Sequence, residues 1–516
     1  MLETWARLMR SRGSDEERAL RGVRGRAERE VREALAGYDA FVRDALSIEE
    51  GLVLGTARSA TKEEIPLRLP WDAEYAHWLV QGGTGTGKTT WVASLLAQEL
   101  EAGRPFGVLD CKGDLYAMAL RMVGRSAPRE RVVIVNPFSD ALVPLNVCRP
   151  LPGSSPEVQA YEVTLALSRL FDRSLGLHME NILRHLLLLL MESDLTLVEA
   201  PQVLEDEVLR GVLAQKSRNE AVKHFFLGTY EAIPQVSKDA LLSRLGSLLL
   251  PENMRLMLGA DDLLDLRGVL DRGDYLFVFL GKGPGVPEEQ VEVLGSLFLQ
   301  LLFQATYARG SGERRGYLIA ADEFFHLLEA PGLAKRFETA LTSVRSFGLS
   351  LMLIHHNFAQ LPVALREIVL GNCDLMTLFR TSGRNAEHFG DFLPEVDPET
   401  FSDASAALRM SRTESRRRQL EALQRLPDRH AYWYDRRKPY RALKLRVPDV
   451  DFPVRAREEE SIVTTATPSR TALRAQIEAR KRRLHDLIRP PVRITRSATD
   501  GADARPADKN KKPTLG

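Results

Sequence analysis

The sequence has few cysteines and no long apolar run. Its 516 residues contain 3 cysteines, Cys111, Cys148 and Cys373, and their separation matches no metal-binding spacing. This usage is typical of a reducing, cytosolic compartment and excludes a disulfide-stapled secreted scaffold. The most apolar run, 186–191, is far shorter than the roughly 20 residues of a membrane-spanning helix. Charges throughout 10–32 also exclude a signal peptide. We therefore expect no transmembrane segment and a cytoplasmic protein, held peripherally at the inner membrane only through partners.

An excess of charge of one sign is also missing. The chain carries 71 Lys and Arg against 70 Asp and Glu, a net charge of +1, so it has no global attraction for nucleic acid. Any contact with DNA must come from local patches. Hydrophobic residues make up 44% and charged residues 27%, which is ordinary for a soluble globular protein. The length exceeds one compact core, so we expect two or three domains or a large insertion.

One stretch carries a specific chemical signature. Residues 82–90 read Gly-Gly-Thr-Gly-Thr-Gly-Lys-Thr-Thr and fit the Walker A template G-x-x-x-x-G-K-[ST]. Glycines let backbone N–H groups surround phosphate oxygens, Lys88 is placed for the β- and γ-phosphates, and the Thr89 hydroxyl for Mg²⁺. An apolar strand, 77–80, precedes the loop, and a helical pattern follows it as far as Gly103. The alternative is a glycine-rich turn without a ligand. The predicted nucleotide-binding residues are Gly82, Gly83, Thr84, Gly85, Thr86, Gly87, Lys88, Thr89 and Thr90.

Short apolar runs alternate with helical patterns along much of the chain. This alternation predicts an α/β fold with a mostly parallel sheet, whose ligand groups lie at the carboxyl ends of the strands. Between 151 and 262 the pattern is almost entirely helical, which indicates an all-α insertion into the α/β domain of 51–150 and 263–452. The expected strands are 77–80, 106–110, 132–135, 275–280, 317–321, 349–354 and 375–379.

The two ends of the chain read differently from the middle. Residues 1–50 form a charged helical pattern with a narrow apolar stripe, either a helix packed on the domain surface or a partner-docking helix. Residues 453–516 form a basic tail that we expect to be largely disordered. Its cluster Arg480–Arg483 lies on one short helix, as a solvated face or as a contact for nucleic-acid phosphates.

An acidic pair follows the strand expected over 317–321. Asp322 suits a Mg²⁺-associated role, and Glu323 suits the general base that activates the attacking water. A surface acidic pair is the alternative. Together with the upstream phosphate loop, the pair favours nucleotide hydrolysis over nucleotide binding alone.

Three further side chains stand near the expected site. Arg345 ends the helix predicted over 333–346, either as an arginine finger toward a neighbouring subunit or as a cation that neutralises the helix dipole. His355 and His356 end the strand 349–354 and are either γ-phosphate sensors or an ordinary hydrogen-bonded pair. A shared metal ion is disfavoured, because adjacent strand residues point to opposite faces.

Several of these stretches occur together and in a set order. They are 77–80 running into 82–89, 109–115, 136–137, 144–146, 322–324, 343–350, 360–361, 372–374 and 379–380. In that order, over about 51–450, they resemble the type IV secretion coupling proteins (TraG/TraD-like conjugative DNA-transfer ATPases) of the wider HerA/FtsK class of P-loop motors.

The resemblance implies a RecA-like P-loop core and a homo-oligomer, a hexameric ring with ATP and Mg²⁺ at subunit interfaces. It also implies DNA, single- or double-stranded, in the central channel, Arg345 as a finger acting in trans, and a relaxase or other cargo on 151–262. Two departures stand out. Family members usually begin with transmembrane helices, and their sensor glutamine falls where His356 stands here. An imidazole donates to a γ-phosphate only in the suitable tautomer or when protonated.

The first hypothesis is therefore an ATP-hydrolysing DNA translocase, or coupling ATPase, for conjugative transfer of the type IV kind. In this hypothesis the candidate catalytic residues are Lys88, Asp322, Glu323, Arg345 and His356. The candidate Mg²⁺ ligands are Thr89 and Asp322. One alternative is an ATP-gated recruitment scaffold that moves no DNA. Another is a soluble HerA/FtsK-like motor that acts in DNA processing or defence.

Overall fold

The computed structural model describes most of the chain between 47 and 488. The described ranges are 47–58, 64–71, 75–168, 176–310, 314–328, 331–393, 412–438, 442–448 and 467–488, with scattered positions between 25 and 45. Most of the helical segment predicted over 1–50 therefore lies outside the described residues.

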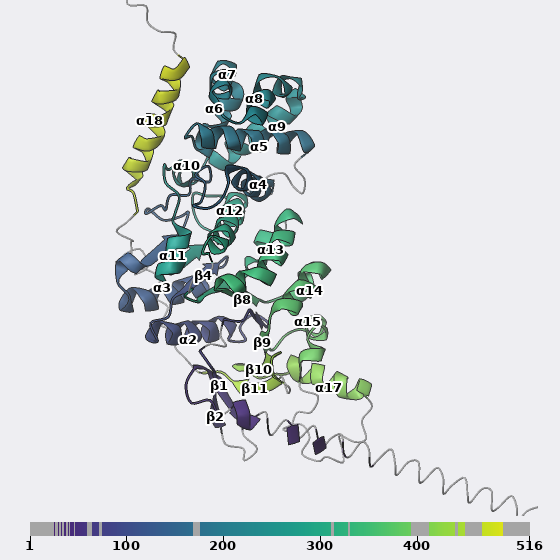
Figure 1. Ribbon diagram of the computed structural model, residues 1–516. Helices are drawn as coiled ribbons and strands as arrows, with labels where there is room; N and C mark the ends of the chain where they lie inside the picture. The colour runs from purple at the N-terminus through teal and green to yellow at the C-terminus, as the bar shows by residue number, and fades with distance from the viewer. Residues whose placement is uncertain are drawn as a thin grey trace, which may run out of the picture.

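A single sheet of 11 strands forms the centre of the molecule, in the order β2-β1-β11-β10-β9-β3-β8-β7-β4-β6-β5 (Figure 1). The seven strands from β9 to β5 in this order run parallel, which confirms the predicted parallel sheet. The other four, β10, β11, β1 and β2, pair antiparallel at one end. The strands are β1 (Leu52–Arg58), β2 (Glu64–Leu69), β3 (Trp78–Gln81), β4 (Phe106–Asp110), β5 (Val132–Val135), β6 (Tyr275–Phe279), β7 (Tyr317–Asp322), β8 (Leu349–His355), β9 (Leu375–Phe379), β10 (His430–Asp435) and β11 (Ala442–Arg446).

Helices cover both faces of the parallel part. Because successive strand residues point to opposite faces, Trp78 and Val80 join one hydrophobic core and Leu79 joins another. The first core lies under α2 (Lys88–Glu101) and α3 (Asp114–Ser126). The second lies under α12 (Glu288–Tyr307), α13 (Pro331–Ser343) and α14 (Val363–Asn372). Two further helices, α15 (Gly383–Glu387) and α17 (Arg412–Gln424), pack together beyond β9.

Between β5 and β6 the described residues form helices and no strand. The two ends of this excursion meet in an isolated bridge between Leu145 and Leu263, so the helical segment leaves and re-enters the α/β core at one place. It stands above the sheet in Figure 1 and packs on it through α4 against α12. Its helices are α4 (Pro156–Leu167), α5 (Leu177–Glu192), α6 (Ala200–Glu205), α7 (Glu207–Lys216), α8 (Glu220–Leu227), α9 (Gln235–Leu249) and α10 (Glu252–Leu258). Helix α11 (Leu266–Arg272) follows the bridge and packs on α12.

One helix of the predicted tail is part of the fold. Helix α18 (Arg470–Ile488) runs along the helical insertion and packs on α7 and α10 (Figure 1). Its buried positions are Leu473, Ile477, Arg480 and Leu484, a spacing of three and four residues that makes one continuous stripe. The helix expected around Arg480–Arg483 is thus present and longer than expected, and apart from 467–488 the range 453–516 lies outside the described residues.

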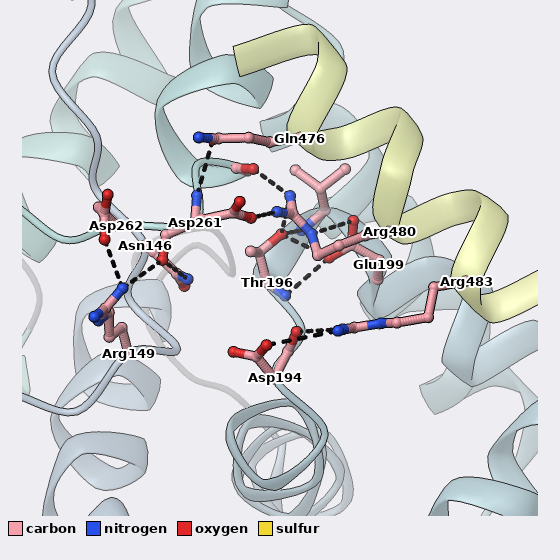
Figure 2. Close-up of polar contacts among 12 residues, drawn as sticks. Asn146, Arg149, Asp194, Thr196, Glu199, Asp261, Asp262, Gln476, Arg480 and Arg483 are labelled. Carbon is pink, nitrogen blue, oxygen red and sulfur yellow. Dashed lines mark hydrogen bonds and ion pairs between the residues drawn. The ribbon is translucent and has the colours of Figure 1, made fainter. Parts of the chain in front are cut away.

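The basic cluster on this helix is not a uniform solvated face. Arg480 is 5% exposed, and Figure 2 shows its guanidinium directed into the insertion, toward Glu199 and Asp261. Its Nε donates to Glu199 Oε1 at 3.2 Å, and its other nitrogens donate to Asp261 and to the carbonyl of Gly259. A phosphate contact by Arg480 is therefore excluded, because its donors are used inside the fold.

Among the described residues, no helix combines the length and the apolar character that crossing a membrane requires.

Candidate functional site

The predicted site residues meet at the carboxyl edge of the parallel strands. Strand β8 lies between β3, which leads into the phosphate loop, and β7, which ends in Asp322. On the far side of β7, β4 ends in Asp110, which pairs in register with Asp322. Parallel strands present their ends at the same edge, so Lys88, His355, Asp322 and Asp110 share one location.

The phosphate loop has the backbone that its glycines permit. Gly85 and Gly87 have φ of 77° and 101°, in the left-handed region that glycine tolerates best. A Cβ at Gly82 would lie 2.5 Å from the Cβ of Phe379 on β9, so this position excludes side chains. Lys88, 8% exposed, donates to the carbonyl oxygens of Gly82 (2.6 Å) and Gly83 (2.9 Å). The ammonium therefore lies across the loop.

Neighbouring strands hold the loop against the N-terminus of α2. The backbone N–H of Gly83 donates to the carbonyl of Arg380, just after β9, at 2.7 Å. Thr86 closes the loop internally through its hydroxyl, which donates to the Gly83 carbonyl at 2.8 Å. Thr89 and Thr90 lie in the first turn of α2 and are half-buried. A helix N-terminus with free N–H groups is a ready-made anion site, so this geometry fits a phosphate group.

Asp322 is a buried carboxylate with too little positive charge around it. It is 3% exposed, and burial, with Asp110 and Glu323 nearby, raises its pKa to about 8, against the opposing effect of Lys88 and Lys112. A divalent cation would supply the missing charge. Oxygen donors such as this carboxylate and the Thr89 hydroxyl are what Mg²⁺ prefers, so the residues present fit this ion.

Glu323 is held in an uncommon conformation by two histidines. Its φ is 53°, in the left-handed region that non-glycine residues rarely adopt, and such strain clusters at functional sites. His355 Nδ1 contacts its Oε2 at 2.6 Å, and His356 Nδ1 contacts its Oε1 at 2.5 Å. Burial raises the pKa of Glu323, but the hydrogen bonds and charge of His355 and His356 outweigh it, so the pKa lies below its ordinary value. The carboxylate is thus kept ionised.

Both histidines contact the same carboxylate, and this contradicts the expectation that adjacent strand residues point to opposite faces of the sheet. That expectation placed His355 and His356 on opposite faces of a continuous strand. Strand β8 ends at His355, and His356 already lies outside it, so the alternation does not apply to the pair. His355 is buried, whereas the side chain of His356 is 43% exposed.

Arg345 lies at the other edge of the sheet. It belongs to a short 3-10 helix, Val344–Phe347, that precedes β8, and its guanidinium contacts Asp374 at 2.6 Å. The seven residues of β8 span roughly 20 Å, so Arg345 does not reach the phosphate loop of its own chain. Within one subunit the structure therefore brings together Lys88, Asp322, Glu323 and His356, but not Arg345.

Sequence reasoning gave no role to Asp110 and Lys112, although both stand at the site. Asp110 is fully buried and accepts hydrogen bonds from the backbone N–H groups of Lys112 (2.6 Å), Gly113 (2.8 Å) and Tyr116 (2.9 Å). It thereby shapes the turn into α3. Lys112 pairs with Asp114 at 3.2 Å. The sequence does carry a signal for Asp110, because it is an acidic residue at the end of a buried strand.

Comparison with known protein families gives one match. Residues 63–144, which include β3, the phosphate loop and Asp110, match the family described as the type IV secretion-system coupling protein DNA-binding domain. The sequence matches no curated protein. Over these residues the match confirms the resemblance to type IV coupling proteins.

Solved structures with the same fold include the coupling protein TrwB and the protein VirB4. The bacterial conjugative coupling protein TrwBdeltaN70, in an unbound form, has a TM-score of 0.52 and 18% identity, over 80% of this chain and 92% of its own. The plasmid coupling protein TrwB with the ATP analogue ADPNP has a TM-score of 0.51 and 18% identity, and the match covers 80% of this chain and 92% of TrwB. VirB4 of Thermoanaerobacter pseudethanolicus has a TM-score of 0.53 and 14% identity, and the match covers 79% of this chain and 98% of VirB4. The expected RecA-like fold is confirmed.

Proposed function

We propose that the protein is a P-loop ATPase that couples ATP hydrolysis to the recruitment and movement of DNA or nucleoprotein in conjugative, type IV transfer. One observation carries the enzymatic part: the loop of Lys88 and the Asp322–Glu323 pair share the carboxyl edge of the sheet, with the strand β8 between them. This is the arrangement that P-loop hydrolysis requires.

Substrate binding uses the loop and the first turn of α2. The N–H groups of 82–90 surround the phosphates of ATP, and Lys88 exchanges the carbonyl oxygens of Gly82 and Gly83 for the β- and γ-phosphates. Thr89 and Asp322 hold Mg²⁺, which neutralises charge on the phosphates when it is bound. The solved TrwB complex with an ATP analogue supports ATP as the nucleotide.

Hydrolysis needs a base that is ionised and fixed in place. Glu323 meets both conditions, since His355 and His356 contact its two oxygens and keep its pKa low. It accepts a proton from the water that attacks the γ-phosphate. The resemblance puts a sensor glutamine at the position of His356, and the 43% exposure of this side chain supports a turn of the ring from Glu323 toward the γ-phosphate.

The site is completed by a second copy of the chain. Arg345 does not reach the nucleotide of its own chain, and its side chain is 54% exposed, which supports a role at the site of a neighbouring copy. In a hexameric ring it leaves Asp374 and contacts the neighbour's γ-phosphate. Opening and closing of this interface would transmit the hydrolysis cycle to DNA.

DNA and cargo have separate candidate locations. The DNA-binding family match over 63–144 supports a DNA contact by the α/β domain. The helical insertion 151–262 stands away from the sheet and offers a relaxase or another cargo protein a surface of its own (Figure 1). The helical insertion thereby recruits the cargo, and the α/β domain moves the DNA.

The test is ATP turnover by the full chain, with and without single- and double-stranded DNA. We expect DNA to raise turnover several-fold, and Lys88→Ala and Glu323→Gln to abolish it. Turnover that DNA leaves unchanged in an assembled ring would contradict movement of DNA and support the ATP-gated recruitment scaffold. Turnover that survives both substitutions would contradict the assigned site.

A further inference from the structure

Glu323, His355 and His356 form a cluster of three potential metal ligands. One ligand atom from each residue can be chosen so that all three lie within 4.8 Å of one another, and no other group of His, Cys, Asp and Glu among the described residues does this. Two imidazoles and one carboxylate are the ligand set of many zinc sites.

The contacts of His355 direct its Nδ1 toward Glu323, which leaves this nitrogen in position to bind an ion shared with the carboxylate. Its Nε2 lies 3.1 Å from the carbonyl oxygen of Asn357, which can only accept, so Nε2 carries a hydrogen. Its Nδ1 faces an oxygen of Glu323 at 2.6 Å, and a neutral imidazole has no second hydrogen to place there. Either a proton or a metal ion must lie between Nδ1 and the carboxylate.

The surroundings of His355 match those of a metal ligand. A metal-binding imidazole usually donates its other N–H to a backbone carbonyl or a carboxylate, which fixes the ring and leaves the binding nitrogen free. The Asn357 carbonyl does this for His355. The ring is also packed edge-on against Phe325, with 4.9 Å between centroids, so one ligand of the cluster is rigid.

The geometry needs only a small adjustment to accept an ion. Zinc–nitrogen and zinc–oxygen bonds of about 2.0–2.2 Å place tetrahedral ligand atoms roughly 3.3 Å apart. The contacts of 2.6 Å and 2.5 Å between Glu323 and the histidines must open by less than about 1 Å. The widest pair of ligand atoms lies within 4.8 Å and must close by up to about 1.5 Å. His356 is 43% exposed, so its ring can make this movement and the ion can enter from solvent.

We propose that Glu323, His355 and His356 bind a divalent transition-metal ion of the Zn²⁺ type, and that the bound ion removes Glu323 from the hydrolysis of ATP. The second part rests on the proposed function; the binding itself does not. Mg²⁺ prefers oxygen ligands, whereas imidazole suits zinc and its transition-metal neighbours. The phosphate site and this cluster therefore select different ions, and the ion on the cluster acts as an inhibitor.

Binding is tested on the full chain without a polyhistidine tag. Zn²⁺ affinity is measured by calorimetry, and Co²⁺ is added as a probe whose visible spectrum reports tetrahedral nitrogen ligation. We expect one tight site in the wild type. His356→Gln, at an exposed position, replaces the imidazole ligand by an amide that still forms hydrogen bonds. The Zn²⁺ affinity should therefore fall at least about tenfold, and the Co²⁺ bands should vanish. His485→Ala, exposed on α18, is the matched control and should bind as the wild type does.

Zn²⁺ affinity that is equal in the wild type and in His356→Gln would overturn the site. The effect on hydrolysis is measured separately, in Mg²⁺ and ATP with buffered Zn²⁺. We expect Zn²⁺ at site-saturating concentration to suppress wild-type turnover at least tenfold and a chelator to restore it. Binding without loss of turnover would overturn the inhibitory part. If the metal-free protein does not hydrolyse ATP, the proposed function fails while the binding result stands.

Discussion

Substitution of Arg480 by alanine should detach helix α18 from the insertion. The residue is 5% exposed, although arginine is rarely buried, and it occupies one position of the otherwise apolar stripe of α18. Figure 2 shows the guanidinium directed at Glu199, Asp261 and the carbonyl of Gly259. Alanine would remove all of these contacts at once.

The expected cost follows from what Arg480 leaves behind. Glu199 has a side chain only 1% exposed, and its Oε1 receives the Nε of Arg480. Its Oε2 keeps two donors, the backbone N–H and the hydroxyl of Thr196. Breaking a buried pair costs about 3–5 kcal/mol, because one charge is left uncompensated. Since half of this carboxylate remains hydrogen-bonded, we expect the lower end, about 3 kcal/mol.

The assay is urea denaturation, with hydrogen exchange to locate the change in 196–199 and 470–488. Arg482→Ala on the same helix is the matched control: Arg482 is exposed and donates to the Glu478 carbonyl, so its loss should change stability by less than about 0.5 kcal/mol. Arg480→Met combined with Glu199→Gln removes both charges and should recover much of the loss. If Arg480→Ala costs no more than Arg482→Ala, the buried ion pair does not hold the helix.

Three more predictions concern the contact between α18 and the insertion, the acidic pair and the subunit interface. Gly259→Ala should destabilise by about 1–3 kcal/mol in the same assay, because its Cβ would lie 2.6 Å from the Arg255 carbonyl and 2.9 Å from Ile477; Gly246→Ala, in open space on α9, should be neutral or stabilising. Asp322 has a pKa raised to about 8 from 3.8, so the folded state holds its proton more tightly and stability should fall as pH rises between those values. Asp322→Asn should therefore be more stable than the nucleotide-free wild type at pH 8, by a few kcal/mol at most, and the difference should vanish near pH 4; equal stabilities at both pH values would contradict this. Arg345→Ala should lower turnover at least about a hundredfold. Mixing it with Glu323→Gln subunits should restore part of the activity if Arg345 acts in trans, and no restoration is the contrary result.

The parallel sheet could be predicted from sequence because its strands are buried on both faces. Such strands read as short continuous apolar runs, as 275–279 and 317–321 do, and the second run leads directly into Asp322 at the site edge. The first two strands were not predicted. In β1 and β2 buried and half-buried residues mix, because they form an antiparallel hairpin at the end of the sheet. Local pattern does not separate such strands from turns.

Helix α18 shows why a buried polar residue is hard to see in a sequence. Its stripe is interrupted by Arg480, so the segment looks like a solvated basic helix. The partners that neutralise the guanidinium, Glu199 and Asp261, are more than 200 residues away in the chain. No local signal marks them. The pairing of Arg345 with Asp374 and the meeting of two histidines at Glu323 likewise depend on where β8 begins and ends.

The central claim is that one edge of the sheet holds a triphosphate at Lys88 and activates water at Glu323. The most direct measurement is ATP binding and single-turnover hydrolysis, in parallel, for the wild type, Lys88→Ala and Glu323→Gln. We predict that Lys88→Ala loses both binding and hydrolysis. Glu323→Gln should keep ATP affinity within a few-fold of the wild type and lose at least about a hundredfold in the rate of hydrolysis. Hydrolysis by Glu323→Gln at the wild-type rate, or undiminished ATP binding by Lys88→Ala, would contradict the claim.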